Sequence, residues 1–458
     1  MRLSPRWIME VLSCSLVAYA ASVTVQSNTL LDSSWIYFVS YDGLVNLNSF
    51  EISGIITHNG YQYATWYTSS RYAMIGRRQL GANSWSTIQL PHQLSTNDSH
   101  DVVVVGVLPK MVGACALRRK RKPLKNCRVH IAMDCHSTKM CYIMSVANLA
   151  TNPGSMSWTA SQFGSLQTTL NGVNLGSSIT YPQFVLAANG RLQLSYRVGI
   201  SGNGQASIAE YNESTWSILG QWSSPTGTYT STNDVASTAR NLYIHGFTYK
   251  SGRLHSSGTW REQNTGFLCS SGGLTNHDTI YVYSDDISTT VGTTGTSSLV
   301  GIASTGIIVY PLDPNHGLMN QESQDVDTTG LPHVMISYVP GRFGQCVSNY
   351  VTDRLWTKSE LPYALNSVGC TQLVMDSRDN AWAVLPFVRV AVATKAGGWK
   401  DWNLVYDGTT TGLSGFGEVV VDRIRMQAGQ DVLSVMYQKS SSGSTPSELR
   451  VVEFLLNA

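Results

Sequence analysis

Charged residues are scarce in this chain of 458 residues. Asp, Glu, Lys and Arg together make up 13%, and the formal net charge is only +2. One run contains six of the basic residues, so the rest of the chain is slightly acidic: Arg118, Arg119, Lys120, Arg121, Lys122 and Lys125. Proteins that bind nucleic acid or anionic membranes through their overall charge carry a much larger basic excess. We therefore predict a partner that is neither nucleic acid nor membrane.

Long apolar runs and amphipathic helices are also missing after residue 21, and the eight cysteines form no CxxC pair. Residues 1–21 begin with basic residues, continue with an apolar stretch and end on small residues, which is typical of a secretory signal peptide. A buried first helix is the alternative. No later segment has the apolar length of a membrane span. We expect a secreted, extracellular protein that is a monomer.

Glycine (40), tyrosine (22) and tryptophan (12) are plentiful, which favours short strands joined by many turns. The strand-like stretches are Trp35–Ser40, Tyr61–Thr68, Asp101–Leu108, Val129–Asp134, Met140–Val146, Leu192–Val198, Thr279–Tyr283, His333–Tyr338 and Glu418–Val421. Turn signals such as Asn59-Gly60, Asn189-Gly190 and Ser251-Gly252 lie between them.

A weak tryptophan repeat accompanies these strands. Six tryptophans open polar strand-like stretches, namely Trp85, Trp158, Trp216, Trp260, Trp356 and Trp402. Most of their spacings fit units of roughly 45 to 60 residues, which predicts an all-β fold, a seven-bladed β-propeller. A pair of β-sandwich domains is the alternative, but no Pro- or Ser-rich linker separates two halves. We therefore expect residues 22–458 to form a single propeller domain.

The segment from Pro109 to Cys127 breaks this pattern. The flanking stretches 101–108 and 128–134 read as an antiparallel hairpin, whose loop normally has about two to five residues. The segment is much longer and carries the basic run. It could be a polyanion-binding or nuclear-targeting loop, but we favour a tolerated surface insertion or an error of the gene model. We predict that residues 111–126 are an aberrant insertion.

Antiparallel pairing brings two pairs of polar residues to strand ends. His100 precedes the first strand of that hairpin and His136 follows the second, so both lie at the end away from the insertion. A turn at Asn189-Gly190 would place Tyr181 opposite Arg197 at the open end of another hairpin. If the two hairpins belong to adjacent blades, all four side chains meet on one face.

Other kinds of site remain open. Strand-end histidines often have only a structural role. Some metal ligands could come from His100, Asp101, Asp134, Cys135 and His136, although no tight spacing requires a metal. A GxSxG nucleophile elbow is absent. Candidate paired carboxylates of a glycosidase are Glu322, Asp325 and Asp327. Asn97-Asp98-Ser99 is a glycosylation sequon.

Imidazole, phenol and guanidinium groups together suit the elimination of a 4-O-linked group from a uronic acid. Arg197 would hold the carboxylate and stabilise the developing enolate charge. A histidine would take the C5 proton, and a second histidine or Tyr181 would assist or protonate the leaving oxygen. This chemistry shifts the interpretation of His136 from metal ligand to proton-transfer base.

Several stretches around these residues resemble one known group of proteins: "NDSHDVVVVGV", "RVHIAMDCHST", "TYPQF", "LSYRVGISGNG" and "YIHGFTYKSGRLHSSGTWRE". In this order they resemble the propeller polysaccharide lyases with BNR-like repeats. That group includes ulvan lyases and, with the stronger resemblance, the fungal L-rhamnose-α-1,4-D-glucuronate lyases. The resemblance implies a seven-bladed propeller that acts as a carbon–oxygen lyase on polysaccharides.

By motif, the resemblance assigns catalytic roles to His136, His100, Tyr181 and Arg197. We add His245, Arg253 and His255 as expected substrate-binding residues that line the site. We expect no cofactor and no metal ligands in the site, and leave a structural metal ion open. We predict cleavage of the rhamnose–glucuronate linkage of arabinogalactan or gum arabic-type glycans by β-elimination between C4 and C5 of glucuronate. The alternatives are an ulvan-type endolyase, a non-catalytic carbohydrate-binding propeller and, more distantly, a sialidase-like hydrolase.

Overall fold

The computed structural model describes residues 21–36, 51–108, 127–187, 191–267, 275–285, 299–304, 306–314, 316–338, 356–363, 370–427, 430–441 and 445–458. The predicted signal peptide, apart from Ala21, lies outside the described residues, as do the predicted insertion 111–126 and the turn at Asn189-Gly190.

Nearly all regular structure in these residues is β-strand, which confirms the all-β prediction. The described helices are α1 (Arg423–Gln427) and the 3-10 helices η1 (Ala160–Gln162) and η2 (Thr265–Phe267). None of the helices in the described part of the chain combines the length and apolar character needed to cross a bilayer.

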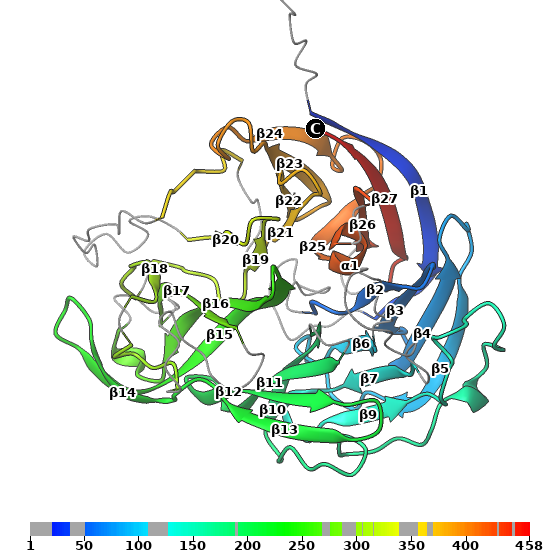
Figure 1. Ribbon diagram of the computed structural model, residues 1–458, viewed down its shortest axis with the longest axis horizontal. Helices are drawn as coiled ribbons and strands as arrows, with labels where there is room; N and C mark the ends of the chain where they lie inside the picture. Colours follow the sequence, from blue (N-terminus) through cyan, green and yellow to red (C-terminus); the bar gives the residue numbers. More distant parts are fainter. Residues whose placement is uncertain are drawn as a thin grey trace, which may run out of the picture.

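The sheets follow one another around a ring in chain order (Figure 1). One sheet contains β2 (Ile55–His58), β3 (Tyr61–Tyr67), β4 (Tyr72–Gln79) and β5 (Ser86–Gln93). The next contains β6 (Val103–Val107), β7 (Val129–Met133) and β9 (Cys141–Met144). The third contains β8 (His136–Thr138), β10 (Ile179–Leu186), β11 (Leu192–Ile200), β12 (Asn203–Tyr211) and β13 (Trp216–Gln221).

The ring continues through the second half of the chain. A five-stranded sheet contains β14 (Thr226–Thr230), β15 (Ala236–Lys250), β16 (Arg253–Glu262), β17 (Asn276–Ser284) and β18 (Ile308–Tyr310). A two-stranded sheet contains β19 (Ser323–Val326) and β20 (Pro332–Met335). The last two sheets contain β21 (Gln372–Met375), β22 (Ala381–Leu385), β23 (Arg389–Ala393) and β24 (Asn403–Asp407), and then β25 (Gly415–Val421), β26 (Val432–Lys439), β27 (Leu449–Asn457) and β1 (Ser22–Asp32).

The predicted number of blades is wrong for the described residues. Six sheets have three to five strands and form blades, whereas β19 and β20 make only a two-stranded pair. The tryptophans on which the prediction was based occupy different strand positions in different blades. Trp216 opens the outer strand β13, but Trp260 lies inside β16, the strand next to β15. The tryptophans therefore do not mark one equivalent position per blade.

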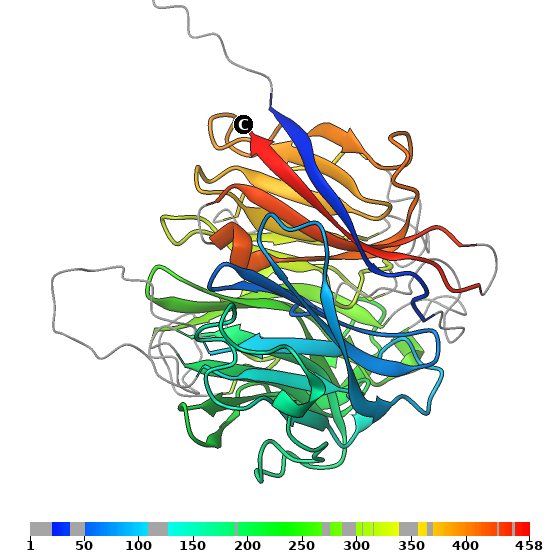
Figure 2. The same ribbon diagram turned by 90° about the vertical axis from the view of Figure 1, so that its right-hand side faces the viewer.

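Ring closure joins the two ends of the described chain. β1 pairs antiparallel with β27, from Ser22 opposite Asn457 to Asp32 opposite Leu449. The two strands lie side by side in both views (Figure 1, Figure 2). The first strand thus completes the last blade as its outermost strand and covers the edge of β27.

The cores lie between neighbouring blades, and β6 shows how the sequence builds them. Val103 and Val105 face the cluster shared with β2 and β3, while Val104 faces the cluster shared with β11 and β12. This alternation is the two-residue period of a strand whose both faces are buried. The β6–β7 hairpin is thereby held firmly, which positions the residues at its ends.

Candidate active site

The two histidines predicted to be neighbours are in contact. β6 and β7 pair antiparallel, with Val103 opposite Met133, so the residues before β6 and after β7 lie at the same end of the hairpin. His100 precedes β6 and His136 opens β8. Their rings stack with centroids 3.9 Å apart and an angle of 24° between the planes. This juxtaposition confirms the hairpin prediction.

The second predicted pair also meets, but with a different register. Arg197 lies opposite Thr180, and Tyr181 lies in a β-bulge of β10 with φ = 56°. The expected Tyr181–Arg197 strand pairing is therefore wrong by one residue, because a bulge adds an unpaired residue and redirects its side chain. The Arg197 guanidinium nevertheless lies over the Tyr181 ring, 4.9 Å from its centroid.

The bulge also joins the two pairs into one cluster. β8 pairs with β10, placing His136 opposite Thr180. The Tyr181 ring lies 6.2 Å from the ring of His100 and 5.7 Å from that of Tyr243 on β15. The four residues predicted from sequence thus gather with Tyr243, which sequence reasoning missed.

Asp98 holds both histidines and was likewise missed. Its Oδ1 lies 2.6 Å from Nδ1 of His100, and its Oδ2 lies 2.5 Å from Nδ1 of His136. Burial opposes the charge on Asp98, but the hydrogen bonds from the two histidines lower the pKa of this carboxyl well below its usual range. An ionised carboxylate only accepts hydrogen bonds, so each Nδ1 donates. In the neutral rings the lone pair is then on Nε2, where a base needs it.

Burial also acts on His100 directly. It lowers the pKa of the His100 imidazole, and the hydrogen bond to Asp98 opposes this effect. The ring is therefore neutral over a wider pH range than a solvated histidine. A neutral imidazole can accept a proton near neutral pH.

Arg197 is a buried cation with no carboxylate partner in the described part of the chain. Its side chain lies in the interior, with the residue 4% exposed. Nη2 donates to Oγ1 of Thr180 at 2.9 Å, and Nη1 donates to the hydroxyl of Tyr243 at 3.3 Å. No Asp or Glu of the described residues forms a salt bridge with it. A guanidinium presented in this way matches the planar fork of a carboxylate.

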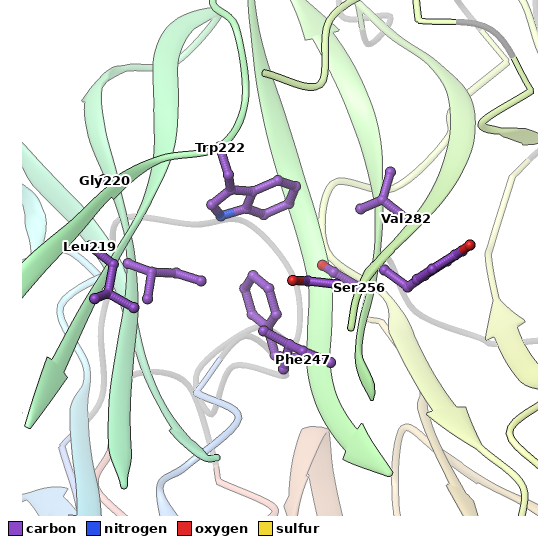
Figure 3. A pocket seen from close by; sticks show the side chains of 10 residues that line it. Leu219, Gly220, Trp222, Phe247, Ser256 and Val282 are labelled. Atoms are coloured by element: carbon purple, nitrogen blue, oxygen red, sulfur yellow. The ribbon is translucent and has the colours of Figure 1, made fainter. Parts of the chain in front are cut away.

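A pocket of about 390 Å³ adjoins this cluster and has a mixed lining. Its polar members include Tyr181, Gln183, Arg197 and Gln321. Another pocket, of about 370 Å³, lies between β12–β13 and β15–β17 and is lined mainly by apolar side chains, including Trp222 and Phe247 (Figure 3). Sugars need several polar contacts for orientation, so the polar pocket is the better candidate for substrate.

The three predicted substrate-binding residues lie in different surroundings. His245 is buried beside β19, where its Nδ1 accepts the backbone N–H of Glu322 at 2.9 Å, and burial lowers its pKa to about 3. His255 is buried and pairs with Tyr281 through Nδ1 at 2.6 Å. Arg253 is partly exposed, pairs with Asp285 and stacks on Tyr283.

Two of these positions are remote from the histidine cluster. Strand pairing places His255 opposite Thr248 and Arg253 opposite Lys250, five and seven residues beyond Tyr243 along β15. At about 3.3 Å per residue, that is roughly 15 Å or more from the cluster. A direct role of His255 or Arg253 at the reacting atoms is therefore not favoured by the fold.

The candidate glycosidase carboxylates hold strands together. Asp325 accepts the backbone N–H groups of Val326 and Met375, both at 2.8 Å. Asp327 accepts the N–H of Thr329, and Glu322 that of Ser337. Backbone donors occupy all three side chains, so they serve the β19–β20 turn and its neighbours.

The metal set suggested by the sequence does not assemble as a unit. Cys135 is buried and its thiol donates to the carbonyl of Met133. Asp101 accepts the hydroxyl of Thr96 at 2.5 Å.

The sequence around Asp98 contains a local pattern that could have identified this residue, although we interpreted it only as part of a glycosylation sequon. An Asp two residues before a histidine can accept that histidine's backbone N–H, as Asp98 does at 3.0 Å.

Comparison with known proteins agrees with this architecture. The model of the BNR repeat-containing family matches residues 61–112 and 122–364, and the gap between these matches lies within the predicted insertion. No curated protein sequence matches the chain. The crystal structure of the polysaccharide lyase Uly1 is similar with a TM-score of 0.66 and 16% identity, over 94% of this chain and 99% of that one.

A PL25 ulvan lyase solved with -[GlcA(1-4)Rha3S]- bound is similar with a TM-score of 0.54 and 13% identity, over 92% of this chain and 94% of that one. At such identities the two structures demonstrate a shared fold. The family match, in contrast, covers more than half of the chain. This chain therefore belongs to the BNR repeat-containing family.

Proposed function

We propose that this protein is an exported polysaccharide lyase that cleaves the rhamnose–glucuronate linkage of arabinogalactan or gum arabic-type glycans. The observation that carries the proposal is the guanidinium of Arg197, which is buried without a carboxylate partner among the described residues. An unpaired buried charge is costly, so a site that retains one is suited to an anionic ligand. The carboxylate of a uronic acid supplies that charge.

Arg197 would bind this carboxylate through its fork and draw negative charge toward it. Loss of the C5 proton places charge on the carboxylate oxygens, and a nearby guanidinium stabilises this enolate-like state more than the ground state. Tyr243 and Thr180 support the guanidinium through hydrogen bonds to Nη1 and Nη2. This support limits its freedom before substrate binds.

His136 would take the C5 proton on Nε2, since Asp98 accepts from its Nδ1. The electron pair of the C5–H bond forms the C4=C5 double bond while the C4–O4 bond breaks. Tyr181 would donate its hydroxyl proton to the departing O4. The products are a 4,5-unsaturated glucuronate and a free hydroxyl on the sugar that leaves, and exchange with water restores both side chains.

The similar structures support lyase chemistry on a polysaccharide. One is a polysaccharide lyase, and the other is a PL25 ulvan lyase with -[GlcA(1-4)Rha3S]- bound. An ulvan-type endolyase is therefore the second candidate. A carbohydrate-binding propeller without activity is the third.

Incubation with gum arabic and, separately, with ulvan tests the proposal. We expect rising ultraviolet absorbance from the unsaturated uronate, together with free rhamnose from gum arabic. Absorbance gain on ulvan without free rhamnose would identify an endolyase. Folded protein that yields no absorbance gain on either glycan would exclude the lyase.

A further inference from the structure

A second cluster of titratable side chains lies beside the first. His92 is near the end of β5, Asp134 follows β7, and Cys141 opens β9. Cys141 pairs with Met133 across β7 and β9, which brings its side chain near Asp134. Ligand atoms of all three side chains lie within 4.8 Å of one another. Three strands thus deliver one imidazole, one carboxylate and one thiol to a single point.

Each carboxylate oxygen of Asp134 has its own contact. One carboxylate oxygen, Oδ2, contacts Nε2 of His92, and the other, Oδ1, accepts the hydroxyl of the buried Tyr67. The side chains of His92 and Asp134 are only 10% and 16% exposed. Tyr67 therefore fixes the carboxylate orientation while Oδ2 faces the cluster, which is the usual arrangement of an outer partner behind a metal ligand.

No Lys or Arg in the described part of the chain supplies the cluster with a permanent positive charge. Within the described residues, His92 is the ion-pair partner of Asp134, and no Lys or Arg pairs with this carboxylate. The Asp134 carboxylate and the Cys141 thiol thus lie together in a partly buried position, where a bound cation would compensate a negative charge on either group.

We infer that His92, Asp134 and Cys141 bind a zinc-class divalent cation through Nε2, Oδ2 and Sγ. Nitrogen, oxygen and sulfur ligands in one set suit zinc better than calcium or magnesium, which prefer oxygen alone. Three protein ligands leave the fourth tetrahedral position for water. Binding releases the thiol proton of Cys141 to solvent.

The neighbouring triad of Asp98, His100 and His136 is less suited to the same ion. That triad contains no thiol, and the proposed reaction already uses His136, whose Nδ1 is held by Asp98. The proposed cation instead occupies the turn that leads to His136. Asp134 has φ = 55° and lies two residues before His136. A metal ligand at that position holds the turn in its left-handed conformation.

Metal binding to the full chain tests this inference without any substrate. After dialysis against a chelator, the protein is titrated with Zn²⁺ and with Co²⁺, whose thiolate complexes absorb in the near ultraviolet. We expect one ion per chain and a cobalt–thiolate band. Cys141→Ser should remove the band and weaken zinc binding by at least about tenfold, as expected when coordination is disturbed. His92→Ala should weaken binding similarly.

His100→Ala is the matched control, because it removes an imidazole from the other triad. It should bind zinc as tightly as the wild type. Absence of the cobalt–thiolate band in folded wild-type protein would overturn the inference, even if the Cys141 variant failed to fold. Equal zinc affinity in wild type and Cys141→Ser would also overturn it. Loss of zinc in His100→Ala alone would place the ion in the other triad.

Discussion

Asp98 and Arg197 give the candidate site its chemical character. The Asp98 carboxylate accepts from Nδ1 of two stacked histidines, while the Arg197 guanidinium is buried without a matching carboxylate in the described residues. One group determines which imidazole nitrogen is basic, and the other attracts an anionic ligand. His136 and Tyr181 would then transfer the protons.

Replacing the proposed base tests this division of roles. His136→Ala should lower kcat on glucuronate-containing substrate by about 10²- to 10⁴-fold, because a positioned general base contributes that much. The His136 side chain is 28% exposed, so the fold should be unchanged. Absorbance assays measure the loss of activity, and circular dichroism checks that the fold is unchanged. Wild-type activity in this variant would remove His136 from the mechanism.

Asp98→Asn tests the positioning of the histidines through pH dependence. The activity of the wild type should fall in acid as His100, whose ring stacks on that of His136, becomes protonated and places a positive charge beside the base. Asp98 favours the protonated form of His100, so its removal should lower the pKa of that imidazole further and move the acid limb of the pH–rate profile to lower pH.

The plateau rate of Asp98→Asn should also fall by about 10²- to 10⁴-fold, because an amide supplies one acceptor where two Nδ1–H groups need one each. Asp285→Asn, at an exposed carboxylate paired with Arg253, should leave the profile unchanged. An unshifted acid limb in Asp98→Asn would argue against the positioning role.

Paired strands position the site residues, and close packing between the blades that contain β6 and β10 holds these strands in place. Gly106 of β6 packs on Phe184 of β10, and an added Cβ would lie 2.5 Å from the aromatic ring. The hairpin argument from the sequence succeeded for His100 and His136 because antiparallel pairing relates strand ends whatever the loop length. The same argument predicted the wrong register at Tyr181, because packing against neighbouring strands determines where a bulge forms.

Gly106→Ala should destabilise the protein by about 1–3 kcal/mol, since the methyl group overpacks the contact between two blades. The midpoint of urea unfolding measures this. Gly301→Ala is the control, because its added Cβ would meet only Ser224 at an ordinary 3.5 Å. It should change stability by less than about 0.5 kcal/mol. Equal midpoints for the two variants would contradict the close packing of these blades.

At the scale of the whole molecule, the fold depends on how the ring of blades is closed and on how the strands are connected. The first strand, β1, completes the last sheet by pairing with β27. Between the paired residues Val107 and Val129 the chain carries the segment predicted to be an insertion. Since this hairpin is paired up to that point, the segment connects two strands whose register does not depend on it.

Deletion of residues 111–126 should therefore leave a folded protein. It would shorten the Val107–Val129 connection to roughly five residues, an ordinary hairpin length. Loop-closure entropy should then stabilise the fold by about 1 kcal/mol, measured by urea unfolding. A longer deletion, 103–126, removes β6 and should abolish folding. Failure of the shorter deletion to express as folded protein would show that the segment is a structural element.

The sequence by itself determined the all-β class, the approximate positions of eight of the described strands and the meeting of His100 with His136. These depend on local periodicity and on hairpin geometry, which short stretches specify. Tertiary structure decided the number of full blades, the bulge at Tyr181, the bridging role of Asp98 and the meeting of His92, Asp134 and Cys141. Each of these depends on packing between strands from different parts of the chain, and spacing along one sequence does not record that packing.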